Sequence, residues 1–194
     1  WAGEDEIPGK ADYGAKALID ELHSALDPKA YRKAVALLAE SEFIDIFGVE
    51  NSLTPAMDLF TKLGYLGLTC RLNTDAYLQQ IGAGHLPHGA VAVAFSHSGS
   101  SADTVKALRL AKSHGAKTIA ITNAIGAPLA SWADVTLLTG RDSHTIYGNA
   151  IFSRVADTAL VDMLYMGVIL SDYGRFSTAL DESGRMIRDR VFEN

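Results

Sequence analysis

The fold is decided by residues 90–101, which read Ala90-Val91-Ala92-Val93-Ala94-Phe95-Ser96-His97-Ser98-Gly99-Ser100-Ser101. The first half is a continuous apolar run, which is typical of a strand buried on both faces of a parallel sheet. The second half is rich in serine and glycine, and a helical pattern follows through Thr104 to Ser113. The stretch therefore predicts a strand, a polar turn and a helix, which is the repeating unit of an α/β fold.

The same unit recurs along the chain. Apolar runs predict four further strands, at 43–49, 67–72, 118–122 and 135–138. Upstream, helical spacing over 11–40 predicts two helices, with Asp27 as N-cap of the second and Pro28 in its first turn. A long, mostly buried helix is expected over 149–170. The side chains expected in the core are Ile44, Ile46, Phe47, Leu59, Leu63, Val91, Val93, Phe95, Leu108, Ile119, Ile121, Leu137, Val155, Leu160 and Leu164.

Strands that alternate with helices in this way predict an α/β fold, a three-layer α-β-α sandwich around a five-stranded parallel sheet with flavodoxin-like connectivity. The chain has 194 residues, which suffices for one domain with its own core. We expect a short helical leader over 1–26 and one domain over 27–194.

The composition limits the function. The formal net charge of −6 gives no basic surface for nucleic acid, and the single cysteine, Cys70, excludes an internal disulfide and a multi-cysteine zinc site. No apolar run reaches the roughly 20 residues that cross a bilayer, and the acidic start is unlike a signal peptide. We therefore expect a cytoplasmic protein with no membrane partner. A chain that begins at Trp1 rather than Met indicates a processed protein or a piece of a longer one.

The polar turn after the third strand has the groups that hold a phosphate monoester. Ser96, Ser98 and Ser101 supply hydroxyls, Gly99 lets the backbone approach, and a helix N-terminus favours an anion. Ser52 stands at the corresponding position after the first strand. The alternative is that the serines are turn residues and that residues 100–103 form a capping box, which fits an isolated hexapeptide equally well. Position after a buried strand favours the phosphate site.

The sequence here resembles the sugar isomerase (SIS) domain family, whose signature S-x-S-G-x-[ST] is matched by Ser96, Ser98, Gly99 and Ser101. The resemblance continues through 111–116, 121–123 and 128–134, and it covers roughly 27–170 in order. It implies that the domain binds a sugar phosphate. The contacts that it implies are Ser52, Ser96, Ser98 and Ser101, with the His97 and Ser100 amides and Thr104 as weaker candidates.

Within that family, the chain looks most like the effector domain of RpiR-type transcriptional regulators of carbohydrate metabolism. The similar segments are the leader over 26–38, Phe152-Ser153-Arg154-Val155-Ala156-Asp157, and 161–165. The resemblance implies a homodimer or higher oligomer paired through the long helix. It also implies DNA binding only through a helix-turn-helix domain that this chain lacks.

An aldose–ketose isomerase is the alternative, and it needs a general base beside the sugar carbons. The candidates are Glu50, His85, His88, His97, Asp142 and His144. Many relatives have a second glycine where this chain has Glu50, and Asp142 and His144 follow the fifth strand. We expect most of these to be solvated loop residues, so that Glu50, Asp142 and His144 are weak catalytic candidates. We expect no metal and no cofactor.

Overall fold

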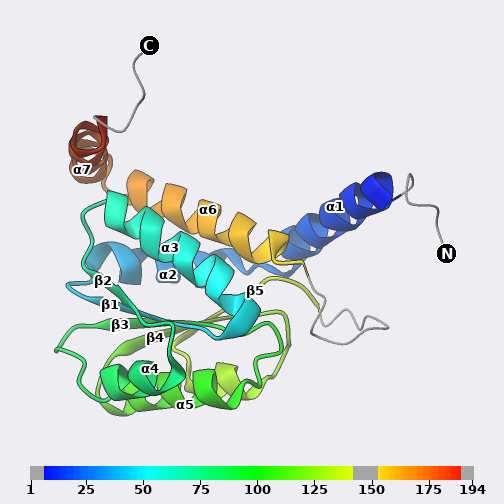
Figure 1. Cartoon of the computed structure of the whole chain (residues 1–194), viewed down its shortest axis with the longest axis horizontal. Helices are drawn as coiled ribbons and strands as arrows, with labels where there is room; N and C mark the ends of the chain where they lie inside the picture. Colours follow the sequence, from blue (N-terminus) through cyan, green and yellow to red (C-terminus); the bar gives the residue numbers. More distant parts are fainter. Residues whose placement is uncertain (1–6, 142–152, 189–194) are drawn as a thin grey trace.

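The computed structural model describes residues 7–141 and 153–188 (Figure 1). Asp142 and His144, two of the catalytic candidates, lie outside the described residues. The elements in chain order are α1 (Ile7–Ala25), α2 (Pro28–Glu40), β1 (Ile44–Phe47), η2 (Glu50–Ser52), α3 (Leu53–Tyr65), β2 (Cys70–Leu72), α4 (Ala76–Ala83), β3 (Val91–Phe95), α5 (Ala102–Ser113), β4 (Lys117–Thr122), η3 (Pro128–Trp132), β5 (Val135–Leu138), α6 (Val155–Ser171) and α7 (Tyr173–Met186).

The sheet has five parallel strands in the order β2-β1-β3-β4-β5. Ile44 of β1 is paired with Cys70 of β2 on one side and with Val91 of β3 on the other. This confirms the predicted five-stranded parallel sheet and its flavodoxin-like order. The chain leaves β1 toward one edge and β3 toward the other, so the carboxyl ends of these two strands flank the crevice where such sheets bind ligands.

Helices cover both faces of the sheet, which confirms the three-layer sandwich (Figure 1). On one face lie α2, α3 and α6, and on the other lie α4, α5 and η3. The first core is built from large aliphatic side chains, whereas the second contains mainly alanine around Phe47 and Leu108. Because alanine side chains are small, α5 can pack close to β3 and β4.

The predicted core is confirmed at every position except Val155, which is partly buried. Val155 is the first residue of α6, and α6 is buried through later turns that include Leu160 and Leu164. Asp27 caps α2 as predicted, because its carboxylate accepts a hydrogen bond of 2.9 Å from the Lys29 amide. The long helix begins at Val155 instead of near 149; residues 149–152 are outside the described ranges, and 153–154 are not helical.

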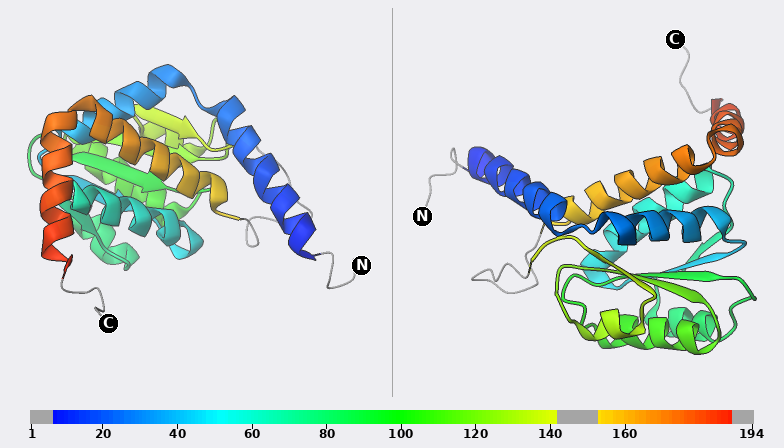
Figure 2. Two further views of the ribbon diagram at one scale, coloured as in Figure 1. Left: turned by 90° about the horizontal axis from the view of Figure 1, so that it is seen from above. Right: turned by 180° about the vertical axis from the view of Figure 1, so that it is seen from behind.

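Two helices lie at the ends of the layer that contains α6 (Figure 2). Helix α1 extends away from the body of the domain, and its C-terminal half packs against α6 with Leu22 fully buried. Helix α7 crosses the far end of α3 and α6 and inserts Phe176 into the core. Within the described ranges, no helix is both long and apolar enough to cross a membrane.

Candidate functional site

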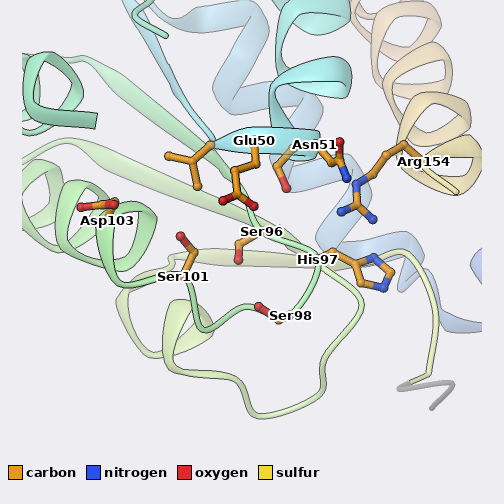
Figure 3. A pocket seen from close by; sticks show the side chains of 10 residues that line it. Glu50, Asn51, Ser96, His97, Ser98, Ser101, Asp103 and Arg154 are labelled. Atoms are coloured by element: carbon orange, nitrogen blue, oxygen red, sulfur yellow. The ribbon is translucent and has the colours of Figure 1, made fainter. Parts of the chain in front are cut away.

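A cavity of about 390 Å³ lies where β1 and β3 end (Figure 3). It is therefore at the edge of the sheet where the strand order predicts ligand binding. The residues that line it are Val49, Glu50, Asn51, Ser52, Ser96, His97, Ser98, Ser101, Asp103 and Arg154. They come from four parts of the fold, namely the turn after β1, the turn after β3, the first turn of α5 and the residue before α6.

Gly99 shapes the turn after β3. Its φ of +61° lies in the left-handed region, and a Cβ added here would overlap the Cβ of Ala127 and lie 2.9 Å from Oγ1 of Thr122. The Gly99 amide donates to the Ser96 carbonyl at 2.9 Å, and the Gly99 carbonyl accepts from the Leu129 amide at 2.9 Å. These contacts hold the serine loop, residues 96–101, against η3, and they require glycine.

The serine loop divides its polar side chains between the cavity and its own backbone. Ser96, His97, Ser98 and Ser101 line the cavity. Ser100 does not line it, because its hydroxyl donates to the Ser98 carbonyl at 3.2 Å and its amide donates to the Ser98 Oγ at 3.3 Å. Ser100 therefore stabilises the turn through its two hydrogen bonds to Ser98.

Of the two remaining predicted contacts, Ser52 lines the cavity and Thr104 does not. Thr104 is fully buried in the first turn of α5, and its hydroxyl donates to the Ser101 Oγ at 3.3 Å, so it supports a lining residue without lining the cavity. Ser52 ends η2 after β1 and does line the cavity. The structure therefore brings five of the seven predicted contacts to one surface, and it leaves Ser100 and Thr104 behind that surface.

The start of α5 shows that the capping-box alternative is wrong. The N-cap is Ser101, not Ser100, and the Ser101 side chain makes no capping hydrogen bond. The Asp103 carboxylate accepts a hydrogen bond of 3.1 Å from Nε2 of Gln80 instead of turning back to the N-cap amide. The first amides of a helix have no acceptor within it. Here they begin at the cavity, where they favour an anion.

Glu50 lies in the turn after β1, and its carboxylate points into the cavity (Figure 3). Its φ is +51°, and among the described residues no other non-glycine residue has a positive φ. The left-handed region disfavours a side chain, so only glycine would be unstrained at this position. A strained residue that lines a cavity is a candidate for function.

Gln79 holds the turn that carries Glu50. Its Nε2 donates to the carbonyls of Gly48 at 2.7 Å and Asn73 at 2.8 Å, and its Oε1 accepts from the Gly48 amide at 3.3 Å. The Gln79 side chain is almost completely buried, so these hydrogen bonds are shielded from water. They fix the backbone on which the Glu50 conformation depends.

The His97 backbone is anchored to β4 while its side chain lines the cavity. Its carbonyl accepts hydrogen bonds from the Thr122 hydroxyl at 3.1 Å and from the Asn123 amide at 3.0 Å. His85 and His88 are placed differently, because they precede β3 and lie at the opposite end of the sheet from the cavity. In residues 7–141 and 153–188, no cluster of three or more His, Cys, Asp or Glu side chains could hold a metal.

Arg154 is a lining residue that the sequence reasoning did not include among the ligand contacts. It precedes α6, its side chain is 13% exposed, and its Nε lies 4.0 Å from Oδ2 of Asp157. Burial raises the pKa of Asp157, while the Arg154 charge and a hydrogen bond from Thr139 oppose that rise. The signal that could have identified it is the Ser-Arg-x-Ala segment at 153–156, although the family resemblance associates this region with subunit pairing.

The sequence model of the SIS domain matches residues 37–167, so this chain belongs to the SIS domain family. It is 30% identical over 179 residues to an uncharacterized HTH-type transcriptional regulator of Caldanaerobacter subterraneus subsp. tengcongensis, covering 92% of this chain and 64% of that protein. It is 28% identical over 189 residues to the regulator HexR of Escherichia coli, covering 97% and 65%. The chain therefore spans about two thirds of the length of these relatives.

Solved structures show the same fold. The Vibrio vulnificus NanR protein, in complex with ManNAc-6P, superposes with a TM-score of 0.90 at 24% identity over 96% of this chain and 70% of that one. The sugar isomerase domain of an RpiR transcription factor from Sphaerobacter thermophilus has a TM-score of 0.84 at 22% identity over 93% and 99%. The resemblance to the SIS domains of RpiR-type regulators is thereby confirmed.

Proposed function

We propose that this chain is the effector-sensing domain of an RpiR-type transcriptional regulator and that it binds a sugar phosphate in the cavity between β1 and β3. The observation that carries the proposal is the serine loop beside the start of α5. Three hydroxyls, on Ser96, Ser98 and Ser101, line the same surface at which uncapped helix amides begin. A phosphate monoester can accept hydrogen bonds from all of these donors, and the helix dipole favours its charge.

The comparisons support a sugar phosphate over other anions. NanR is complexed with ManNAc-6P, and its fold matches nearly all of this chain. For this chain, Ser52, Ser96, Ser98 and Ser101 are the proposed direct contacts, with the His97 amide on the same loop. Ser100 and Thr104 act from behind, because they hydrogen bond to Ser98 and Ser101.

A sensing role agrees better with the relatives than an isomerase role, because they are named as transcriptional regulators. The observation that favours an isomerase is the Glu50 carboxylate in the cavity, which could act as a base. Purified protein that interconverts aldose and ketose phosphates, and loses that activity as Glu50→Gln, would establish the isomerase. Binding without turnover supports the sensor.

The remaining parts of the proposal concern the whole protein. We propose a cytoplasmic regulator in which DNA binding belongs to a separate helix-turn-helix domain, since this chain has a net charge of −6. The division into a leader over 1–26 and a domain over 27–194 is part of the proposal.

We also propose a homodimer, because Met166 and Leu170 of α6 and Tyr173 of α7 are exposed apolar side chains on neighbouring turns. Light scattering at micromolar concentration tests this, and a mass of 20.7 kDa would contradict it.

Thermal unfolding with and without sugar phosphates tests the central proposal. A ligand at 100 times its Kd stabilises the folded state by about 2.7 kcal/mol, which is a measurable rise in Tm. Ser98→Ala and Ser101→Ala should reduce that rise. Ser113→Ala is the matched control, because Ser113 is exposed at the other end of α5 and its hydroxyl donates to the Arg109 carbonyl. An unchanged rise in both loop variants would refute the proposed site.

A further inference from the structure

Four buried polar residues lie at the carboxyl ends of β4 and β5, next to the cavity but outside it. Thr122 ends β4, Asn123 follows it, Thr139 follows β5, and Asp157 lies in the first turn of α6. All four are at most 5% exposed, and none of them lines the cavity. A buried polar group is costly unless it is hydrogen-bonded, so the contacts of these residues show which parts of the fold they connect.

The first contact is with the serine loop. The Thr122 hydroxyl donates to the His97 carbonyl at 3.1 Å, and the Asn123 amide donates to the same carbonyl at 3.0 Å. Gly99 also lies against the Thr122 hydroxyl, because a Cβ added to this glycine would be 2.9 Å from Oγ1. The backbone of the serine loop is therefore fixed to the end of β4, and a displacement of one moves the other.

The second contact is with α6. The Thr139 amide donates to the Thr122 carbonyl at 3.0 Å, and the Asp157 carboxylate accepts a hydrogen bond from the Thr139 side chain. The other buried side chains of α6 are apolar, namely Ala156, Leu160, Val161, Leu164, Val168 and Ile169. Apolar contacts have no preferred direction, whereas a hydrogen bond fixes the positions of its two groups. The bond between Thr139 and Asp157 therefore sets where the first turn of α6 lies relative to the sheet.

The start of α6 has a second arrangement close to the observed one. Within residues 7–141 and 153–188, Nε and Nη1 of Arg154 are buried and have no hydrogen-bond partner. The distance from Nε to Oδ2 of Asp157 is 4.0 Å, so a movement of about 1 Å would bring the two groups within hydrogen-bond distance. Helix displacements of about 1–2 Å are typical of switching proteins. In the second arrangement the buried Arg154 charge is paired.

We propose that Thr139 and Asp157 couple occupancy of the cavity to the position of α6. This inference rests on the proposed function, because the signal is a phosphate held by the serine loop. Such a ligand restrains the loop, and the restraint passes through Thr122 to Thr139. Asp157 then moves with Thr139 toward Arg154, and the ligand favours this arrangement by binding to it more tightly. Thr139 and Asp157 are positioning residues, since they act through the loop and not on the ligand.

Amide hydrogen exchange measured by mass spectrometry tests the coupling. Inorganic phosphate is the probe, and chloride at the same ionic strength is the blank. The Thr158 amide donates to the Arg154 carbonyl at 2.9 Å, so the amides of residues 158–161 report on the first turns of α6. We expect phosphate to slow their exchange at least threefold, because pairing of Arg154 with Asp157 opposes local opening of this turn.

Variants assign the effect to the Thr139 hydroxyl. Thr139→Val keeps the shape of the side chain, and it should abolish the slowing while the phosphate affinity measured by calorimetry changes less than threefold. Thr139→Ser restores a hydroxyl and should restore the slowing, and Thr139→Ala replaces the valine variant if that variant does not fold. Thr118→Val is the matched control, because Thr118 is equally buried near the other end of β4 and its hydroxyl donates to the Trp132 carbonyl at 2.8 Å. It should keep the slowing.

The outcomes separate this inference from the proposed function. Slowing that persists in Thr139→Val, slowing that is lost equally in Thr118→Val, or phosphate binding without slowing in the unaltered chain would each overturn the coupling. In all three cases Ser98→Ala would still weaken phosphate binding. If the unaltered chain binds neither phosphate nor fructose 6-phosphate, the proposed function is refuted, and the coupling fails with it for lack of a signal.

Discussion

Gly99→Ala should be the most damaging single-methyl substitution in the serine loop. Its φ of +61° costs an alanine about 1–2 kcal/mol, because the left-handed region brings Cβ against the following carbonyl. The added Cβ would also overlap the Ala127 side chain and press on the Thr122 hydroxyl. Forcing a methyl group into a packed site costs about 1–3 kcal/mol more.

Gly115→Ala separates these two contributions. Gly115 has a φ of +88°, but a Cβ there would meet nothing within 4 Å, so alanine at this position has the conformational cost alone. Urea denaturation of the two variants measures the difference. We expect Gly99→Ala to lose about 1–3 kcal/mol more than Gly115→Ala, with weaker sugar phosphate binding as well. Equal losses would mean that the loop does not press against η3, and the reasoning on its shape would be refuted.

Three further predictions concern other residues. Glu50→Gly should be more stable than Glu50→Ala by about 1 kcal/mol in urea denaturation, since only glycine is unstrained at φ +51°; equal stabilities would remove the strain argument. Burial raises the pKa of the Cys70 thiol to about 12, so a thiol reagent at pH 8 should label native protein far more slowly than unfolded protein, and equal rates would contradict this. Burial raises the pKa of Asp134, but hydrogen bonds from Lys112 and Thr118 outweigh this effect and keep the pKa below 3.8. The ionised carboxylate therefore stabilises the fold above pH 3.8, and this contribution is lost as the pH falls through the lower pKa of the folded state. Asp134→Asn should flatten that part of the stability–pH curve, and an unchanged curve would contradict the prediction.

The fold could be predicted from the sequence because its signals are local. Each strand is a short apolar run, each turn is polar, and the Asp27-Pro28 pair marks the start of α2 by its chemistry alone. The parallel direction of the strands followed from their alternation with helices, since parallel strands need crossover connections. The partial exposure of the Val155 side chain could not be predicted, because it depends on the rotation of α6 about its axis relative to the sheet and not on the composition of the helix.

The serine loop could be predicted for the same reason, since its groups lie within six residues and follow a recognisable strand. The sequence did not show which of these groups face the cavity. Ser98 and Ser101 line it, whereas Ser100 closes the turn, and the distinction depends on the left-handed Gly99 and its contact with Ala127. Residues from two distant segments determine this geometry, so the loop pattern alone does not contain it.

Arg154 illustrates the opposite case, in which the local sequence pattern of a cavity residue points to a different role. It precedes a long apolar helix and is separated by more than fifty residues from the serine loop, so its pattern suggested helix pairing. The sheet order brings the start of α6 to the same edge as the carboxyl ends of β1 and β3, and only then does Arg154 lie at the cavity. Because α6 also packs against α1, α2 and α3, a ligand in the cavity lies beside the helix around which that whole layer is organised. A sensor needs such a connection between its ligand and the rest of its fold, whereas an isomerase needs only the reacting groups.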